Sequence, residues 1–193
     1  MVKAGLRVGL GLDGISINDD DDMIQEMRVC FLLHRLNALD VAAPCLTARE
    51  IFKMATDTNA HLIGYGQDLG RLEPGRKADM VLLVYESMCQ PYTEPSIDPV
   101  ETLLYRGAGR NIHTVIVDGK ILVADGRMMS FDEEAISTRL AAAAAQPVST
   151  AEKEKALMTE ALKKHLMHYY RGWTERIAVR PFYIANSRTD QYL

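Results

Sequence analysis

Residues 4–14 read AGLRVGLGLDG, and the interpretation of the whole chain starts from this stretch. Its central part, residues 6–12, is short, apolar and punctuated by glycine, and a polar stretch over residues 13–22 follows it. A short apolar run bounded by turn residues is typical of a buried strand that opens into a loop. We therefore predict a strand over residues 6–12 with Asp13 at its carboxyl end.

A helix is expected directly after the polar stretch. Side chains recur there at helical spacing: Met23, Met27, Cys30, Phe31 and His34. Asn18 or Asp19 can cap this helix, and residues 20–22 would fall in its first turn, where the helix dipole favours carboxylates. The run of acidic residues therefore has a structural role available to it.

A second helical region is predicted by the capping-box pattern of Thr47 and Glu50. It would extend from residue 48 to about residue 56. A further short helix would run through His61 before the chain reaches Gly64.

The middle of the chain is rich in strand signals, which lie at residues 80–85, 114–117 and 120–123. The last two segments flank Asp118-Gly119, a dipeptide typical of a two-residue type I′ hairpin. We expect residues 70–79 and 115–123 to pair in one small sheet, separate from the strand at residues 6–12.

The C-terminal part is expected to be helical. Residues 131–145 favour one helix, and Pro147 would end it. Ser149 and Glu152 form a second capping-box pattern, which predicts a long helix to about residue 170.

Composition excludes several classes of protein. The 193 residues carry 22 Lys plus Arg against 26 Asp plus Glu, a formal net charge of -4, so no attraction to nucleic acid or to anionic membranes is expected. Three cysteines without a CxxC pair suit a reducing cytosol, and no apolar run approaches the roughly 20 residues that span a bilayer. No signal peptide is apparent, so we expect a cytoplasmic protein.

Gly9, Gly11 and Gly14 satisfy the G-x-G-x-x-G pattern of dinucleotide-binding proteins. A pyrophosphate at this place would face Asp13 and the acidic residues 19–22, where backbone donors should dominate. The nucleotide interpretation is therefore disfavoured. A calcium-binding EF-hand is also excluded, because its ligand order is absent.

Asp13 has two readings on spacing alone. A carboxylate at the carboxyl end of a buried strand is where α/β barrels place metal ligands and proton-transfer groups. The same residue could equally be a turn former or an N-cap-like residue.

A family resemblance bears on this choice. Residues 4–14, followed by Asn18-Asp19 and residues 23–28, resemble the last barrel strand and the following helix of the amidohydrolase superfamily. The resemblance is closest to a subgroup that holds aminopurine, adenosine-type, guanine and oxoguanine deaminases and triazine chlorohydrolases. Three further matches follow in the same order: Ala55-Thr56 with Asn59-Ala60, then GRLEPGRKADMVLL at 70–83, then VIVDGK at 115–120 together with DGR at 125–127. The likeness extends from about residue 5 to about residue 140.

The resemblance implies a role for Asp13. In such enzymes the aspartate of the eighth strand touches a catalytic divalent metal and shuttles a proton from the attacking water. The metal would be Zn²⁺, with Fe²⁺ as the alternative. Such an ion lowers the pKa of bound water to about 7, and a neighbouring carboxylate can carry the proton to a leaving amine.

The chain departs from the family in its histidines. The His-x-His pair of the first barrel strand and the ligand histidines of the middle strands are absent. The histidines present are His34, His61, His113, His165 and His168, and none has metal-ligand spacing. We expect each of them to be a packing or surface residue.

The predicted fold class is α/β. A complete (β/α)₈ barrel needs about 250 residues, so we expect only the last strand and helices of a metal-dependent hydrolase barrel, at residues 1–66. The C-terminal part of a small β-sandwich would occupy residues 67–130. A helical extension would occupy residues 131–193.

The function implied is that of the C-terminal part of a metal-dependent amidohydrolase. The whole enzyme would deaminate, or dechlorinate, a small nitrogen-rich aromatic heterocycle. The alternative is a non-catalytic folding or assembly module. The chain by itself should be inactive, because only Asp13 of the metal site remains. It should also form a homo-oligomer, because the segment 6–12 and the face through Met23, Met27 and Phe31 would be uncovered.

Overall fold

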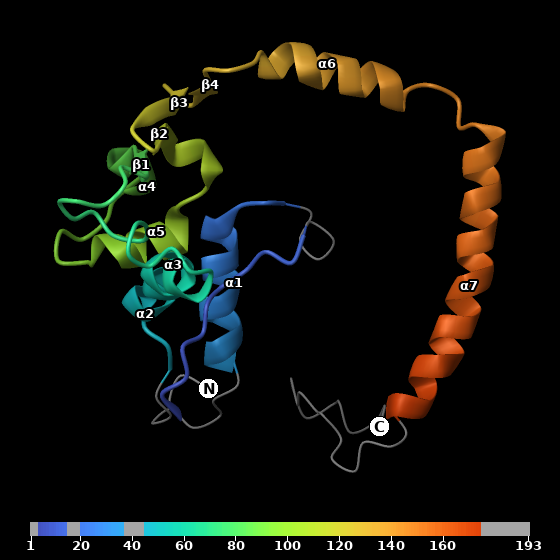
Figure 1. Cartoon of the computed structure of the whole chain (residues 1–193), viewed down its shortest axis with the longest axis horizontal. Helices are drawn as coiled ribbons and strands as arrows, with labels where there is room; N and C mark the ends of the chain where they lie inside the picture. Colours follow the sequence, from blue (N-terminus) through green and yellow to red (C-terminus); the bar gives the residue numbers. More distant parts are fainter. Residues whose placement is uncertain (1–3, 15–19, 37–44, 175–193) are drawn as a thin grey trace. The chain divides into compact units, whose positions relative to one another are not determined.

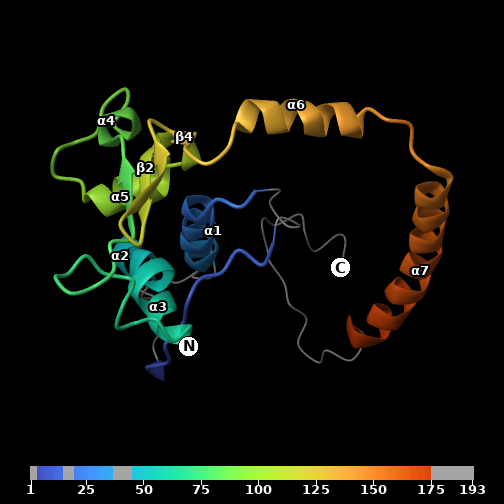
Figure 2. The ribbon, with the colours of Figure 1, turned by 45° about the horizontal axis from the view of Figure 1, so that its top comes forward.

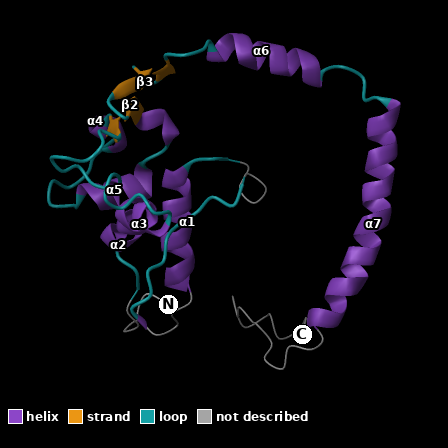
Figure 3. Ribbon diagram, in the orientation of Figure 1, coloured by secondary structure: helices purple, strands orange, loops and turns teal. Residues whose placement is uncertain are grey.

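A computed structural model describes residues 4–14, 20–36 and 45–174 (Figure 1). The chain divides into two compact units, Met1–Ser137 and Thr138–Leu193. The strands gather in one small sheet in the first unit, and the other described elements are helices and loops (Figure 3). The content is thus mixed α and β, as predicted.

Helix α1 spans Met23–Leu36 and begins where the acidic run ends. Its cap is Asp22, whose Oδ1 accepts a hydrogen bond from the Ile24 backbone N–H at 2.8 Å. The other oxygen, Oδ2, accepts from the Gly109 N–H at 2.8 Å, across 87 residues of chain. The carboxylates of residues 20–22 therefore precede the helix and do not form its first turn, and the predicted caps Asn18 and Asp19 lie outside the described residues.

The second helical region is continuous over three elements. These are α2 (Ala48–Lys53), the π-helical η2 (Met54–Thr58) and α3 (Asn59–Leu62). The predicted capping box is confirmed: the Glu50 N–H donates to Thr47 Oγ1 at 3.2 Å, and the Thr47 N–H donates to Glu50 Oε2 at 2.7 Å. These bonds lower the pKa of Glu50, the backbone N–H of Thr47 contributing most.

Four antiparallel strands form one sheet in the order β1-β2-β3-β4. They are β1 (Met80–Leu83), β2 (Ile112–Val117), β3 (Lys120–Ala124) and β4 (Arg127–Met128). Asp118 and Gly119 have φ of 49° and 77°, and Asp125 and Gly126 have 49° and 71°. Positive φ at both central residues is the geometry of a type I′ turn, so the predicted hairpin is confirmed.

The expectation that residues 70–79 belong to the sheet is wrong. The first strand begins at Met80, where it pairs with Ile116. Asp79 instead supports the hairpin, because its Oδ1 accepts a hydrogen bond from the Asp118 N–H at 2.7 Å. The turn residues of this segment hold it out of the extended conformation that pairing requires.

The core of the first unit lies among α1, α2 and α5 (Pro99–Arg106), which lie side by side in Figures 1 and 2. Short helices α4 (Tyr85–Met88) and η3 (Gly109–Asn111) flank α5 in the sequence. The buried cluster comprises Ile24, Met27, Cys30, Phe31, Ala48, Ile51, Met54, Met88, Leu103 and Leu104. Burial, with a smaller contribution from Glu26, raises the pKa of the Cys30 thiol.

This core corrects one expectation about α1. Met27 and Phe31 were expected to be uncovered, yet they are only 4% and 2% exposed, because α2 and α5 cover them. The exposed large apolar side chains of α1 are instead Val29, Leu32 and Leu33.

The remaining helices are α6 (Glu133–Ala144) and α7 (Thr150–Thr174). The capping box before α7 is confirmed, since the Ser149 N–H donates to Glu152 Oε2 and the Glu152 N–H donates to Ser149 Oγ. No helix in the described part of the chain is both long enough and apolar enough to cross a membrane.

Candidate active-site segment

The segment of residues 6–14 carries the candidate catalytic residue. The strand predicted over residues 6–12 does not form, because a strand needs a hydrogen-bonding neighbour and no described strand lies beside it. Asp13 is exposed and has φ 54°, followed by Gly14 at 77°. These values match the Asp-Gly turns at residues 118–119 and 125–126. Asp13 therefore has a left-handed backbone conformation, and its proposed chemical role is a separate prediction.

The segment is held by Asn59, the first residue of α3. The Leu10 N–H donates to Asn59 Oδ1 at 3.1 Å, and the Asn59 amide, Nδ2, donates to the Leu10 carbonyl oxygen. A side-chain carboxamide offers one acceptor and one donor side by side, the same pair that a neighbouring strand would offer. Asn59 thus replaces, at one residue, the pairing that the segment lacks.

Gly9 makes this contact possible. A Cβ at residue 9 would lie 2.0 Å from Asn59 Oδ1 and 2.8 Å from Leu62 Cδ1. Only glycine allows the segment to approach α3 this closely. Two glycines of the G-x-G-x-x-G pattern therefore have structural reasons, the close approach at Gly9 and the positive φ at Gly14. The next helix begins only at Met23 and not at the last glycine, which also departs from the dinucleotide-binding motif.

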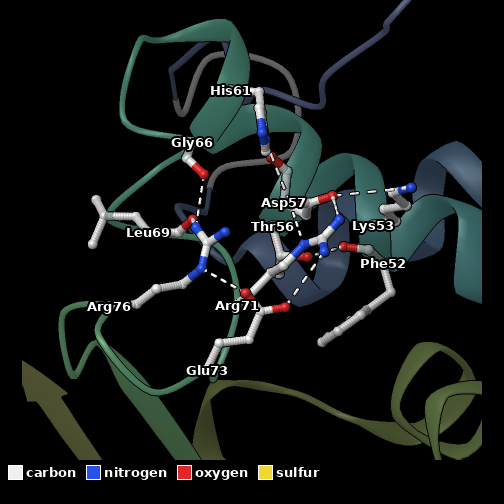
Figure 4. A network of polar contacts seen from close by, with 10 residues as sticks. All are labelled: Phe52, Lys53, Thr56, Asp57, His61, Gly66, Leu69, Arg71, Glu73 and Arg76. Atoms are coloured by element: carbon white, nitrogen blue, oxygen red, sulfur yellow. Dashed lines mark hydrogen bonds and ion pairs between the residues drawn. The ribbon is translucent and has the colours of Figure 1, made fainter.

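An ion pair between a buried aspartate and a half-exposed arginine fixes the helical region that carries Asn59 (Figure 4). Asp57 is 7% exposed and accepts two hydrogen bonds from Arg71, at 2.7 Å from Nε to Oδ1 and 2.9 Å from Nη2 to Oδ2. His61 Nδ1 lies 3.4 Å from Asp57 Oδ1, and Lys53 Nζ lies 3.9 Å from Oδ2. The Arg71 hydrogen bonds, aided by these charges, lower the pKa of the Asp57 carboxyl.

The same network continues into the loop before β1. Glu73 lies between Arg71 and Arg76, at 3.4 Å from Arg71 Nη1 and 2.8 Å from Arg76 Nε. Arg76 Nη1 also donates to the Gly66 carbonyl at 2.7 Å. Gly70 has φ 91°, and a Cβ there would lie 2.8 Å from the Asp57 Cα. The loop is therefore packed directly against η2.

We expect the Asp57–Arg71 pair to make stability depend on acid pH. Because the pKa of Asp57 is lower in the folded chain, its contribution is full above the unfolded value of about 3.9 and is lost as pH falls through the folded value. In the Asp57→Asn variant the free energy of unfolding should therefore fall less steeply below about pH 4 than in the wild type, as measured by urea midpoints at each pH. Arg71 is half exposed, so solvent screening should keep the change moderate. The matched variant of the exposed Asp21, Asp21→Asn, should keep the wild-type slope, and an unchanged slope in Asp57→Asn would refute the assignment.

Two apolar grooves lie beside the helical region. The larger, of about 790 Å³, separates η2 and α3 from the sheet and is lined by residues that include Phe52, Asn59, Ile63, Val115 and Val117. The other, of about 590 Å³, has an apolar floor and the carboxylates of Asp20, Asp21 and Asp22 among its lining residues. Asp13 is not among the lining residues of either groove.

Two of the histidines make contacts that fit packing or surface residues. His34 Nδ1 lies 3.0 Å from the Cys30 carbonyl oxygen, and His113 Nε2 lies 3.0 Å from Asp125 Oδ1. His165 and His168 lie on α7, in the second unit. Among residues 4–14, 20–36 and 45–174, no three His, Cys, Asp or Glu side chains are grouped so that they could hold a metal ion.

Asn59 is the residue whose role the sequence did not reveal. It appears in a matched motif, yet no local pattern indicates that its amide reaches Leu10, 49 residues earlier. The nearest signal is Gly9, because a glycine inside an apolar run often marks a close approach of another part of the chain.

The fold and the matched motifs define a class of protein. The amidohydrolase family matches residues 1–122, which is more than half of the chain. The chain belongs to the amidohydrolase family.

Its relatives in sequence are deaminases. The chain is 36% identical over 136 residues to the 5-methylthioadenosine/S-adenosylhomocysteine deaminase of Syntrophomonas wolfei, covering 70% of this chain and 30% of that protein. It is 38% identical over 136 residues to the 5'-deoxyadenosine deaminase of Methanosarcina mazei, with the same coverage. The chain therefore spans about a third of the length of the curated relatives it matches.

Two solved structures similar to this chain are a chlorohydrolase and a deaminase. A mutant of atrazine chlorohydrolase TrzN from Arthrobacter aurescens TC1, complexed with zinc and atraton, is 31% identical with a TM-score of 0.64, covering 73% of this chain and 30% of that one. A zinc-bound adenosine deaminase from Xanthomonas campestris is 25% identical with a TM-score of 0.64, covering 72% and 30%.

Proposed function

We propose that this chain is the C-terminal portion of a metal-dependent amidohydrolase that removes an amino group from a nitrogen-rich aromatic ring by hydrolysis. The observation that carries the proposal is the anchored segment 6–14 with Asp13 at its end, in a chain of this family. Dechlorination of a similar ring is the close variant.

The substrate we favour is an adenine-bearing nucleoside. Relatives at 36% and 38% identity are deaminases of 5-methylthioadenosine or S-adenosylhomocysteine and of 5'-deoxyadenosine. The chlorohydrolase similarity is lower, at 31%. We therefore favour deamination of a purine over dechlorination of a triazine as the reaction.

Asp13 would act as the proton-transfer group. Its carboxylate would accept a proton from the water that attacks the ring carbon. As the new C–O bond forms and the C–N bond breaks, the carboxylate would return a proton to the departing amine, which leaves as ammonia. Asp13 is exposed, and this exposure fits a residue that must contact the ring of a bound substrate.

The described residues do not fit a complete metal site. A catalytic metal ion needs several protein ligands and an open position for water, and Asp13 is the single matched candidate here. Zinc is present in the related chlorohydrolase and adenosine deaminase structures. We therefore propose a divalent metal, zinc in preference to iron, with its other ligands outside the described residues.

The second candidate function is a folding or assembly module. The apolar groove beside the sheet and the exposed side chains of Val29, Leu32 and Leu33 favour it, because such surfaces mark interaction sites. A homo-oligomer remains part of this proposal.

Fragment complementation separates the two functions. The chain is produced alone and together with a polypeptide carrying the two thirds of the Syntrophomonas wolfei deaminase that the chain does not match. We expect the chain alone to release no ammonia from 5-methylthioadenosine. The complex should release ammonia and hold stoichiometric zinc by elemental analysis. A complex that forms without activity would favour the assembly module, and activity of the chain alone would overturn the proposal.

A further inference from the structure

Asn59 stands at a special place in its helical region. The five residues before it, Met54–Thr58, form the π-helical element η2. A π turn holds an extra residue, so the residues after it are rotated by about 100° relative to an uninterrupted α-helix. This rotation brings Asn59 to the side of the region that faces Leu10.

The π element is itself held in place. Asp57, within it, is paired with Arg71, and Gly70 packs against the Asp57 backbone. Asn59 therefore projects from a well-anchored part of the helix. Leu10, its partner, and Val8 both pack against the core cluster, so the segment is fixed by its side chains and by one residue of its backbone.

We propose that Asn59 is a positioning residue that sets the register of residues 6–14 and so the place of Asp13. Both backbone groups of Leu10 are bonded by Asn59, and only two residues separate Leu10 from Asp13. A slip of one residue in an extended segment turns each side chain to the opposite face. The two hydrogen bonds between Asn59 and Leu10 exclude that slip. The effect on chemistry rests on the proposed function, whereas the effect on register does not.

The register is tested on the full 193-residue chain by amide hydrogen exchange and by the NMR shifts of Asp13 and Gly14. Asn59→Ala should raise exchange of the Leu10 amide about tenfold and move the Asp13 shifts away from left-handed values. Gly11→Ala is the matched control, because a Cβ at residue 11 meets nothing within 4 Å. Unchanged exchange and shifts in Asn59→Ala would overturn the inference.

A double-variant cycle keeps the test independent of folding. Gly9→Ala alone should be strongly disruptive, since its Cβ would clash with Asn59 Oδ1. In the Asn59→Ala background the same change meets only the flexible end of Leu62 and should be much milder. Equal damage in both backgrounds would show that Gly9 and Asn59 do not act through one contact.

The complemented enzyme supplies the chemical readout. Asn59→Ala should lower kcat for ammonia release about tenfold or more with little change in KM, because the proton-transfer group is misplaced while the ring is still bound. Asn59→Gln, which keeps the carboxamide, should recover part of the rate. If Asn59→Ala exposes the Leu10 amide to exchange but leaves kcat at the wild-type value, the positioning role is refuted. An inactive wild-type complex would count against the proposed function only, since the exchange and shift results stand without it.

Discussion

Asp13→Asn is expected to slow deamination strongly in the complemented enzyme, with kcat falling by between about a hundredfold and ten-thousandfold. Asparagine has nearly the same shape as aspartate and tolerates the left-handed backbone observed at φ 54°. The substitution therefore removes the proton acceptor while keeping the backbone conformation. Ammonia release under single-turnover conditions measures the loss, and elemental analysis reports whether the zinc is retained.

The structure offers a matched control for this variant. Asp118 also has a positive φ, at 49°, and precedes a glycine, and it lies far along the sequence in the β2–β3 hairpin. Asp118→Asn should leave the rate of ammonia release near that of the wild type. An Asp13→Asn complex that keeps the wild-type rate would contradict the catalytic role and leave Asp13 as a turn former.

Leu104→Ala is expected to destabilise the first unit by about 3 kcal/mol. Leu104 is 0% exposed and lies in the core cluster among α1, α2 and α5. Loss of a buried leucine side chain removes its transfer free energy and leaves a cavity, which together cost about 2–5 kcal/mol. Because domains of this size are stable by only about 5–15 kcal/mol, the variant should lose a large share of its stability.

Urea unfolding followed by circular dichroism measures this effect as a lower midpoint with an unchanged slope. Leu72→Ala is the control, because Leu72 is 72% exposed and its truncation should change stability by less than about 0.5 kcal/mol. Equal effects of the two substitutions would show that the cluster around Leu104 is not the core of the unit.

Local rules were enough for the parts of the fold whose partners are close in sequence. Thr47 and Glu50 are three residues apart, so their reciprocal hydrogen bonds follow from the pattern itself. The Asp118-Gly119 turn likewise needs only its own two residues to adopt positive φ. The family resemblance was also readable from the sequence, because four motifs stand in one order.

Only part of the candidate site could be predicted from the sequence. The sequence singled out Asp13 by its place after an apolar run, and it rejected the dinucleotide interpretation of the glycines. It did not show that residues 6–12 would form no strand here, because strand formation depends on a neighbour and not on the segment. It also assigned the helix cap to Asn18 or Asp19, whereas the helix begins at Met23 and Asp22 caps it.

The sequence by itself determined the starts of the two helices with capping boxes, at Ala48 and Thr150, the hairpin turn and the family. The tertiary structure alone decided what holds the candidate site, namely the bonds between Asn59 and Leu10 and the pair of Asp57 with Arg71. Those contacts join residues 49 and 14 positions apart. Caps and turns are satisfied within a few residues, so local patterns encode them, but a hydrogen bond across a longer stretch of chain exists only once packing has brought its donor and acceptor together.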